Sequence, residues 1–192
     1  MTTTTAPACV THSPGWLDPS EADALLATLT TSIPWEQKTI LMYGREVATP
    51  RLTCWIGDST YTYSGTKNVA HPWLPELEEL RARLETATAA RYNSCLANLY
   101  RDGRDSVSWH SDDEAELGLT PTIASLSLGS TRAFQLRDEA THEVATIPLG
   151  HGDLVVMRGE SQSRFRHSIP KRAHAGVRLN LTFRHYTERK QP

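Results

Sequence analysis

The sequence predicts an α+β protein, in which an antiparallel β-sandwich or jelly roll carries two helices on the outside of one sheet. Seven or eight short extended segments, separated by turn residues, follow Tyr92, and this spacing is typical of sandwiches and jelly rolls. Two segments with helical periodicity precede them. Because 39% of the 192 residues are apolar, the chain can bury a full core. We therefore expect one folded domain.

The first helix is expected to follow a loosely ordered tail, residues 1–15, which is rich in Thr and Pro. Asp18 is a good N-cap, Pro19 suits the first helical position, and Glu21 completes a capping box. The apolar residues of this helix recur at helical spacing: Ala22, Leu25, Leu26 and Leu29. A second helix is expected to begin near Pro75, with one apolar face: Leu77, Leu80 and Leu84.

Between the two helices, Thr39–Trp55 is expected to form a hairpin with its turn at Gly44. In the C-terminal half, short runs of strand-forming residues predict eight strands: Cys95–Tyr100, Ser106–His110, Thr122–Leu128, Ala133–Arg137, Val144–Ile147, Asp153–Met157, Phe165–Ile169 and Val177–Arg184. Leu126 and Leu128 alternate with polar residues, as in half-buried strands.

Composition excludes several classes of protein. No apolar run approaches the roughly 18 residues that a membrane-spanning helix needs. The first residues lack the basic and apolar regions of a secretory signal. Cys9, Cys54 and Cys95 are widely spaced, without a C-x-x-C motif, so a disulfide framework or a zinc ribbon is not expected. These features predict a protein of the reducing cytoplasm.

Charge is distributed unevenly along the chain. The formal net charge is −2, but the segment from Arg158 to the end carries +7, which leaves −9 for the rest. A basic segment of this kind can form a phosphate-facing surface. It can equally be a solvated strand edge that discourages aggregation. Charge alone leaves both interpretations open.

His110, Asp112 and His167 are candidate metal ligands. Residues i and i+2 of a strand project from the same face, so His110 and Asp112 converge on one point. A lone H-x-D motif is a weak signal. His167, on a separate late strand, strengthens it, because two histidines and one carboxylate form the facial triad of non-heme Fe(II) sites. Such a triad leaves three positions open for a bidentate co-substrate and O₂.

The last predicted strand carries polar residues on a single face: Arg178, Asn180, Thr182 and Arg184. A buried guanidinium at Arg178 could hold a dicarboxylate through a bidentate pair. Inward-facing arginines are costly without a partner, so their presence favours a binding role. An outward-facing basic strand remains the alternative.

Seven short motifs occur along the chain in a fixed order: Pro50-Arg51-Leu52-Thr53, Thr60-Tyr61-Thr62-Tyr63-Ser64-Gly65, Asn98-Leu99-Tyr100 with Asp102-Gly103, His110-Ser111-Asp112-Asp113-Glu114, Ser127-Leu128-Gly129, His167-Ser168-Ile169-Pro170 and Arg178-Leu179-Asn180-Leu181-Thr182-Phe183-Arg184. With this set, the chain from about Thr39 to Arg184 resembles the AlkB family of Fe(II)- and 2-oxoglutarate-dependent nucleic-acid dealkylases, closest to its DNA-repair branch.

The resemblance implies a double-stranded β-helix, that is, a jelly roll, within one domain over residues 16–192. Residues 16–92 would contain the helices and a nucleotide-recognition lid, and residues 93–186 the catalytic core. The implied activity is oxidative demethylation of 1-methyladenine and 3-methylcytosine in DNA, with RNA as a further substrate. It would use Fe(II), 2-oxoglutarate and O₂ and release formaldehyde, succinate and CO₂. A monomer is expected.

The resemblance also assigns roles to residues of the centre. His110, Asp112 and His167 would bind the iron, and Arg178 would bind the distal carboxylate of 2-oxoglutarate. Four further residues would complete the co-substrate pocket: Asn98, Tyr100, Asn180 and Arg184. Taken singly, Tyr100 is better explained as a core tyrosine and Asn98 as a turn-forming amide. Together with the other motifs, both are better explained as pocket residues.

On the substrate side, the resemblance places Tyr63 against the damaged base, with Tyr61 and Arg51 in the same region. Asp113 and Glu114 would accept hydrogen bonds from an exocyclic amine, with simple solvent exposure as the alternative. Met42, Tyr43 and Gly44 occupy the position of a hairpin that enters the base stack, and a wedge of this kind suits base extrusion. Packing against the core is the alternative for Tyr63 and for this hairpin.

Two other functions stay open at this point. An oxygenase of the same chemistry could act on a protein or a small molecule, and would then need no nucleic acid. A non-catalytic jelly-roll binding module would carry only a vestigial triad. The presence of all three ligand residues together with Arg178 argues against the second of these.

Overall fold

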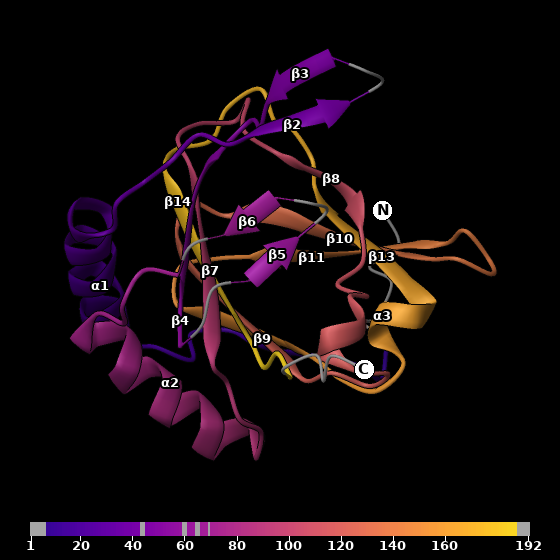
Figure 1. Ribbon diagram of the computed structural model, residues 1–192, viewed down its shortest axis with the longest axis horizontal. Helices are drawn as coiled ribbons and strands as arrows, with labels where there is room; N and C mark the ends of the chain where they lie inside the picture. Colours follow the sequence, from indigo (N-terminus) through magenta and orange to yellow (C-terminus); the bar gives the residue numbers. More distant parts are fainter. Residues whose placement is uncertain (1–6, 43–44, 59–60, 64–65, 69, 188–192) are drawn as a thin grey trace.

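The computed structural model describes residues 7–42, 45–58, 61–63, 66–68 and 70–187, with only the backbone described for 40–42, 45, 61–63 and 66–68. Two antiparallel sheets pack face to face, and two helices lie on one side of the molecule against the larger sheet (Figure 1). The predicted jelly roll, a double-stranded β-helix, is confirmed.

In the described part of the chain the larger sheet has six strands. In spatial order they are β1 (Val10–Ser13), β12 (Asp153–Met157), β9 (Ile123–Gly129), β14 (Arg178–Arg184), β7 (Ser94–Tyr100) and β4 (Leu52–Gly57). The smaller sheet has the order β11 (Val144–Leu149), β10 (Arg132–Asp138), β13 (Phe165–Ile169) and β8 (Val107–His110). Two hairpins stand apart: β2 (Thr39–Met42) with β3 (Arg45–Ala48), and β5 (Tyr61–Tyr63) with β6 (Thr66–Asn68).

The larger sheet is buried on both faces, because each face contributes to a separate core. One face packs under the helices through residues such as Leu126, Leu181 and Phe183. The other face meets the smaller sheet, where Tyr100 and Ile123 contact a core that includes Phe134. A strand buried on both faces reads as a nearly continuous apolar or small-residue run. Strands β10 and β11 of the smaller sheet instead alternate between buried and more exposed residues, because one face of these strands meets solvent.

The two helices form where the sequence predicts them. Helix α1 (Pro19–Ser32) is capped by Asp18, whose carboxylate accepts hydrogen bonds from the backbone of Ser20 and Glu21. Helix α2 (Pro75–Thr88) buries Leu77, Leu80 and Leu84. The Glu21 side chain does not close a capping box, because its carboxylate bonds to Arg83 of α2 and so joins the two helices.

The expectation of a loose tail over residues 1–15 is wrong for Val10–Ser13, which forms strand β1 at the edge of the larger sheet. Val10 is buried in the core between the sheets, and the His12 imidazole bonds to Asp153 at 2.9 Å. Two short elements were also not predicted: α3 (Ser161–Arg164) and the 3₁₀ turn η1 (Ala115–Leu117). Within the described residues, no helix combines the length and apolar character needed to cross a membrane.

Candidate metal centre

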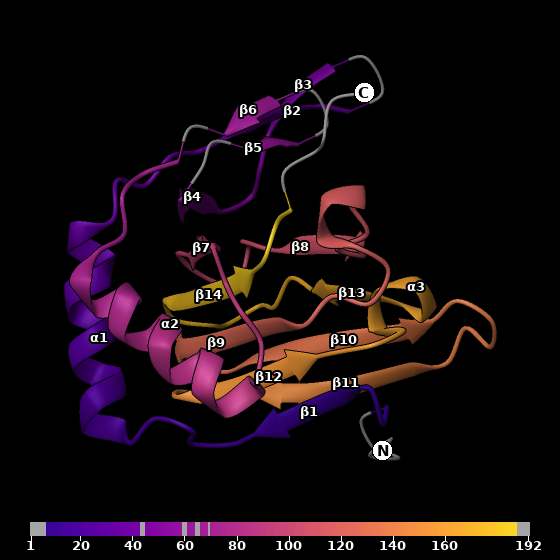
Figure 2. The same ribbon diagram turned by 60° about the horizontal axis from the view of Figure 1, so that its bottom comes forward.

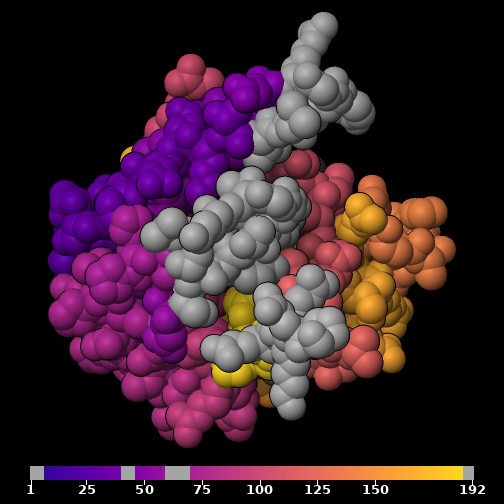
Figure 3. All heavy atoms as spheres, viewed as in Figure 1, coloured from indigo at the N-terminus to yellow at the C-terminus, as the bar shows by residue number. Residues whose placement is uncertain are grey.

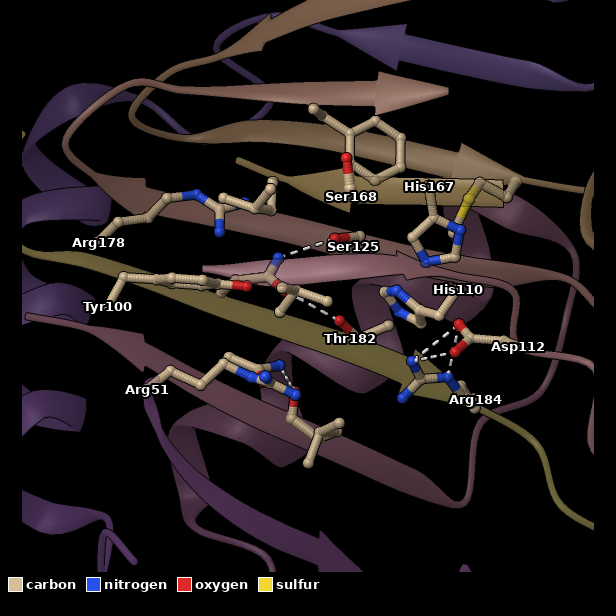
Figure 4. Close-up of a pocket in the computed structure, with 17 residues that line it drawn as sticks. Arg51, Tyr100, His110, Asp112, Ser125, His167, Ser168, Arg178, Thr182 and Arg184 are labelled. Atoms are coloured by element: carbon tan, nitrogen blue, oxygen red, sulfur yellow. Dashed lines mark hydrogen bonds and ion pairs between the residues drawn. The ribbon is translucent and has the colours of Figure 1, made fainter. Parts of the chain in front are cut away.

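His110, Asp112 and His167 meet between the two sheets, as predicted. His110 ends β8, Asp112 follows two residues later, and His167 lies on β13 directly opposite His110 in the antiparallel pair. One ligand atom from each residue lies within 4.8 Å of the others. Figure 4 shows the three side chains turned toward one another at one end of a cavity. This donor set, two imidazoles and a carboxylate, fits non-heme Fe(II).

Both imidazoles are held neutral, as metal ligands must be. Nδ1 of His110 lies 2.9 Å from the carbonyl oxygen of Ser108, to which it donates, so the lone pair is on Nε2. Burial lowers the pKa of His110. Burial, together with the neighbouring His110, lowers the pKa of His167 to about 3. Neither ring therefore competes for a proton near neutral pH.

Asp112 is buried and stays ionised because Arg184 faces it. The Arg184 guanidinium donates to both carboxylate oxygens over 2.8–3.0 Å. Burial opposes ionisation, but the positive charge of Arg184 outweighs it and lowers the pKa of Asp112 to about 2. Arg184 lines the cavity as expected of a pocket residue, but its guanidinium is engaged with this metal-ligand candidate.

At the other end of the cavity Arg178 presents an incompletely paired cation (Figure 4). Its side chain is buried; Nη2 donates to Ser127 Oγ at 2.8 Å, while Nε and Nη1 have no hydrogen-bond partner among the described residues. The guanidinium carbon lies 5.0 Å from the centre of the Tyr100 ring. A buried guanidinium with unused donors is costly alone and is suited to a carboxylate ligand.

Amide side chains line the cavity between these two ends. Asn180 donates to Ser125 Oγ at 2.8 Å and to the carbonyl of Leu126 at 3.0 Å. The Asn98 carbonyl oxygen accepts a 2.7 Å hydrogen bond from Nε of Arg51. Asn98, Tyr100 and Asn180 thus lie where the sequence predicts a co-substrate pocket.

The residues expected to bind the substrate differ in their position relative to the cavity. Arg51 lines the cavity, and no partner is described for its two terminal nitrogens. Glu114 is half-buried; burial and the nearby Asp112 raise the pKa of its carboxyl group. Asp113 is exposed and does not line the cavity. The side chains of Tyr61, Tyr63 and Met42 lie outside the described atoms, as do Tyr43 and Gly44 entirely.

Backbone positions nevertheless locate the two hairpins. Figure 2 shows β2–β3 and β5–β6 together on one side of the jelly roll, above β8 and β14. In the space-filling view, the N-terminal elements occupy one side of this face and β10 and β13 the opposite side (Figure 3). The described backbone of the hairpins therefore lies on the side of the jelly roll that carries β8 and β14, the strands of His110 and Arg184.

Some residues of the site were given no role by the sequence. Ser125 and Ser127 alternate with the leucines of β9 and contact the side chains of Asn180 and Arg178. The period-two pattern that identified the leucines could therefore have identified the serines. Gln162 and Met157 carried no such signal. Gln162 reaches Asp112 from α3, and Met157 lines the cavity from β12.

Comparison with known proteins agrees with this geometry. Residues 9–184 match the model of the 2OG-Fe(II) oxygenase superfamily. The chain belongs to this superfamily. Its members use Fe(II), 2-oxoglutarate and O₂, and the donor set and Arg178 fit these groups.

Named relatives confirm the resemblance to AlkB proteins. The chain is 44% identical over 182 residues to alpha-ketoglutarate-dependent dioxygenase alkB homolog 3 of Mus musculus, with 89% of this chain and 64% of that protein covered. It is 38% identical to the DNA oxidative demethylase ALKBH2 of Arabidopsis thaliana (81% and 59% covered). It is 34% identical to ALKBH2 of Mus musculus (86% and 75% covered). The chain thus spans somewhat less than two thirds of the first two relatives.

Solved structures support the fold. The structure of OsALKBH1 matches with a TM-score of 0.67 at 15% sequence identity, and the match covers 95% of this chain and 99% of the OsALKBH1 chain. A prolyl hydroxylase from Trichoplax adhaerens has a TM-score of 0.65 at 14% identity, with 92% and 83% covered.

Proposed function

We propose that the protein removes N-linked methyl groups from 1-methyladenine and 3-methylcytosine in DNA, and in RNA as a further substrate. The observation that carries this proposal is the cavity that joins a two-histidine, one-carboxylate centre to the incompletely paired guanidinium of Arg178. That combination suits a dicarboxylate co-substrate bound between cation and metal. The AlkB relatives favour nucleic-acid bases as the oxidised substrate.

His110, Asp112 and His167 would hold Fe(II), and Arg178 with Ser127 would hold the distal carboxylate of 2-oxoglutarate. The remaining pocket residues would orient the co-substrate: Asn98, Tyr100, Asn180 and Arg184. When bound, iron and co-substrate supply the oxidation of a methyl C–H bond by O₂, with succinate and CO₂ as co-products. The hydroxymethyl group that results then leaves the base nitrogen as formaldehyde, and the unmodified base remains.

The protein's own part in the reaction is to exclude water and to place the methyl group. Asp113 and Glu114 would accept hydrogen bonds from the exocyclic amine of a cationic methylated base. Tyr63 would stack on that base, with Tyr61 and Arg51 beside it. Met42, Tyr43 and Gly44 would assist extrusion of the base from the stack. We place this activity in a cytoplasmic monomer that acts on single- or double-stranded DNA.

The test is a mass-spectrometric demethylation assay. Oligonucleotides that contain 1-methyladenine or 3-methylcytosine, single-stranded or annealed, are incubated with the protein, Fe(II), ascorbate and 2-oxoglutarate. We expect loss of one methyl group that requires 2-oxoglutarate and is abolished by His110→Ala. Succinate production with every oligonucleotide still methylated would assign the oxygenase to a protein or small-molecule substrate. No turnover in iron-loaded protein would contradict the enzyme assignment.

A further inference from the structure

Gln162 is a buried polar residue that contacts the metal centre from behind. It lies in α3, the single helical turn between β12 and β13, and is 5% exposed. Its side-chain oxygen Oε1 accepts a 2.9 Å hydrogen bond from the backbone N–H of Asp112. The two residues are 50 positions apart in the sequence, so this contact depends on the tertiary fold.

The orientation of the Gln162 amide is determined by its surroundings. Its nitrogen Nε2 lies 3.2 Å from Ser161 Oγ and 3.4 Å from the Met157 sulfur. Both atoms can accept a hydrogen bond, whereas the backbone N–H of Asp112 can only donate. If the amide were flipped, the side-chain NH₂ group of Gln162 would face the backbone N–H of Asp112, and two donors would meet without an acceptor. The oxygen therefore faces Asp112.

Asp112 depends on this contact because the strand ladder ends before it. Strand β8 pairs with β13 only as far as His110, and Asp112 lies in the loop that follows. Arg184 fixes its carboxylate, and Gln162 fixes its backbone. A carboxylate held only at its tip could still move with its loop.

We propose that Gln162 is a positioning residue for metal binding, which holds the Asp112 loop so that the carboxylate stays in register with the two histidines. This inference rests on the proposed function only in taking Asp112 as a metal ligand. Gln162 and His167 are five residues apart on the same α3–β13 segment. That segment therefore both supplies one ligand and anchors the backbone of another.

The experiment measures Mn(II) affinity of the metal-free protein by calorimetry, at a temperature where circular dichroism shows each variant folded. Gln162→Met keeps the length of the side chain but removes the acceptor. Loss of partners outside the ligand shell typically lowers metal affinity by about 10–100-fold, and we expect a loss in this range. Co(II) absorption of the same variant should report altered coordination, which a purely structural contact would leave unchanged.

Ser163→Ala is the matched control, because Ser163 lies in the same turn but is exposed, and its hydroxyl donates to the Glu160 carbonyl. It should bind Mn(II) within about twofold of wild type. Gln162→Glu retains an oxygen at the same position and should bind within about threefold, and it serves as the test if the Met variant does not fold. Unchanged affinity in Gln162→Met, or a tenfold loss in Gln162→Glu, would overturn the proposal.

Failure of the proposed function gives a different result. If no oligonucleotide is demethylated, but Mn(II) still binds more weakly to Gln162→Met than to the wild type and to Gln162→Glu, the positioning role stands. If His110→Ala binds Mn(II) as tightly as wild type, the metal lies elsewhere and the positioning role falls.

Discussion

At the scale of single residues, Arg178 holds a buried charge that no carboxylate of the described protein neutralises. Arg178→Met should therefore leave the metal-free protein as stable or more stable, because an unpaired buried cation is removed. It should also weaken 2-oxoglutarate binding by about 10–100-fold, since hydrogen bonds to charged groups contribute about 1.5–3 kcal/mol. Calorimetry with Mn(II)-loaded protein and urea unfolding of the metal-free protein measure the two effects.

Arg178→Lys is the matched control for this prediction. Lysine keeps the charge but lacks the planar fork that binds a carboxylate through two parallel hydrogen bonds. Its affinity for 2-oxoglutarate should lie between those of the wild type and the Met variant. Equal affinities in all three proteins would show that the co-substrate binds away from Arg178.

Residues of the site differ in how far the sequence could predict them. His110, Asp112, His167 and Arg178 were predictable because the order of the motifs along the chain identifies them. For Arg178, which lies on β14, strand periodicity adds to this signal. The pairing of Arg184 with Asp112 and the contact from Gln162 join residues 72 and 50 positions apart. Such contacts follow from how strands are ordered in the sheets, which local periodicity does not encode.

At the scale of elements, β1 shows how an edge strand depends on a side-chain anchor. The buried Asp153 carboxylate accepts hydrogen bonds from His12 and from the backbone N–H groups of Gly15 and Gly150, all at 2.8–2.9 Å. Asp153→Ala would leave these donors without their acceptor, at a cost of about 1–3 kcal/mol for each that stays buried. We expect the free energy of unfolding in urea to fall by about 3 kcal/mol.

The exposed Asp23, which pairs with His151 at 3.3 Å, provides the control for that measurement. Asp23→Ala should cost less than about 1 kcal/mol, as surface ion pairs do. If Asp153→Ala is no more costly than this control, the anchor does not stabilise β1.

The missed elements share a physical cause. Strand β1 has four residues, of which only Val10 is buried, so it lacks a period-two pattern long enough to be recognised. Its partner strand lies more than 140 residues away in the sequence. In contrast, β12 and β13 begin and end where the sequence predicts. Gly152 and Gly159 flank the apolar run of β12, and Pro170 follows β13.

At the scale of the whole molecule, the larger sheet contributes to both cores, so loss of one core exposes strands that form the other. We therefore expect unfolding in a single cooperative transition. The metal centre lies between the sheets and is part of this cooperative unit. Protonation of its buried groups should then be visible in the stability of the entire protein.

That linkage predicts acid sensitivity in the metal-free protein. The pKa of folded His167 is about 3, below the unfolded value of about 6.5, so below pH 6.5 the unfolded chain binds a proton that the folded chain does not. Stability should fall with decreasing pH by up to about 1.4 kcal/mol per pH unit from this residue. The pKa of folded Asp112 is about 2, so the stability that this carboxylate contributes is lost only below about pH 4.

Urea unfolding in EDTA between pH 7 and pH 4.5 excludes the contribution of Asp112, which stays ionised over this range. Comparison with a histidine variant then isolates the contribution of that histidine. His167→Gln should reduce the slope of stability against pH by nearly one proton, whereas His174→Gln, at an exposed position, should leave it unchanged. His110→Gln offers a second test, because burial also lowers the pKa of His110. If neither variant at the centre reduces the slope, the two imidazoles are not held neutral by the fold, and the centre is less enclosed than its geometry indicates.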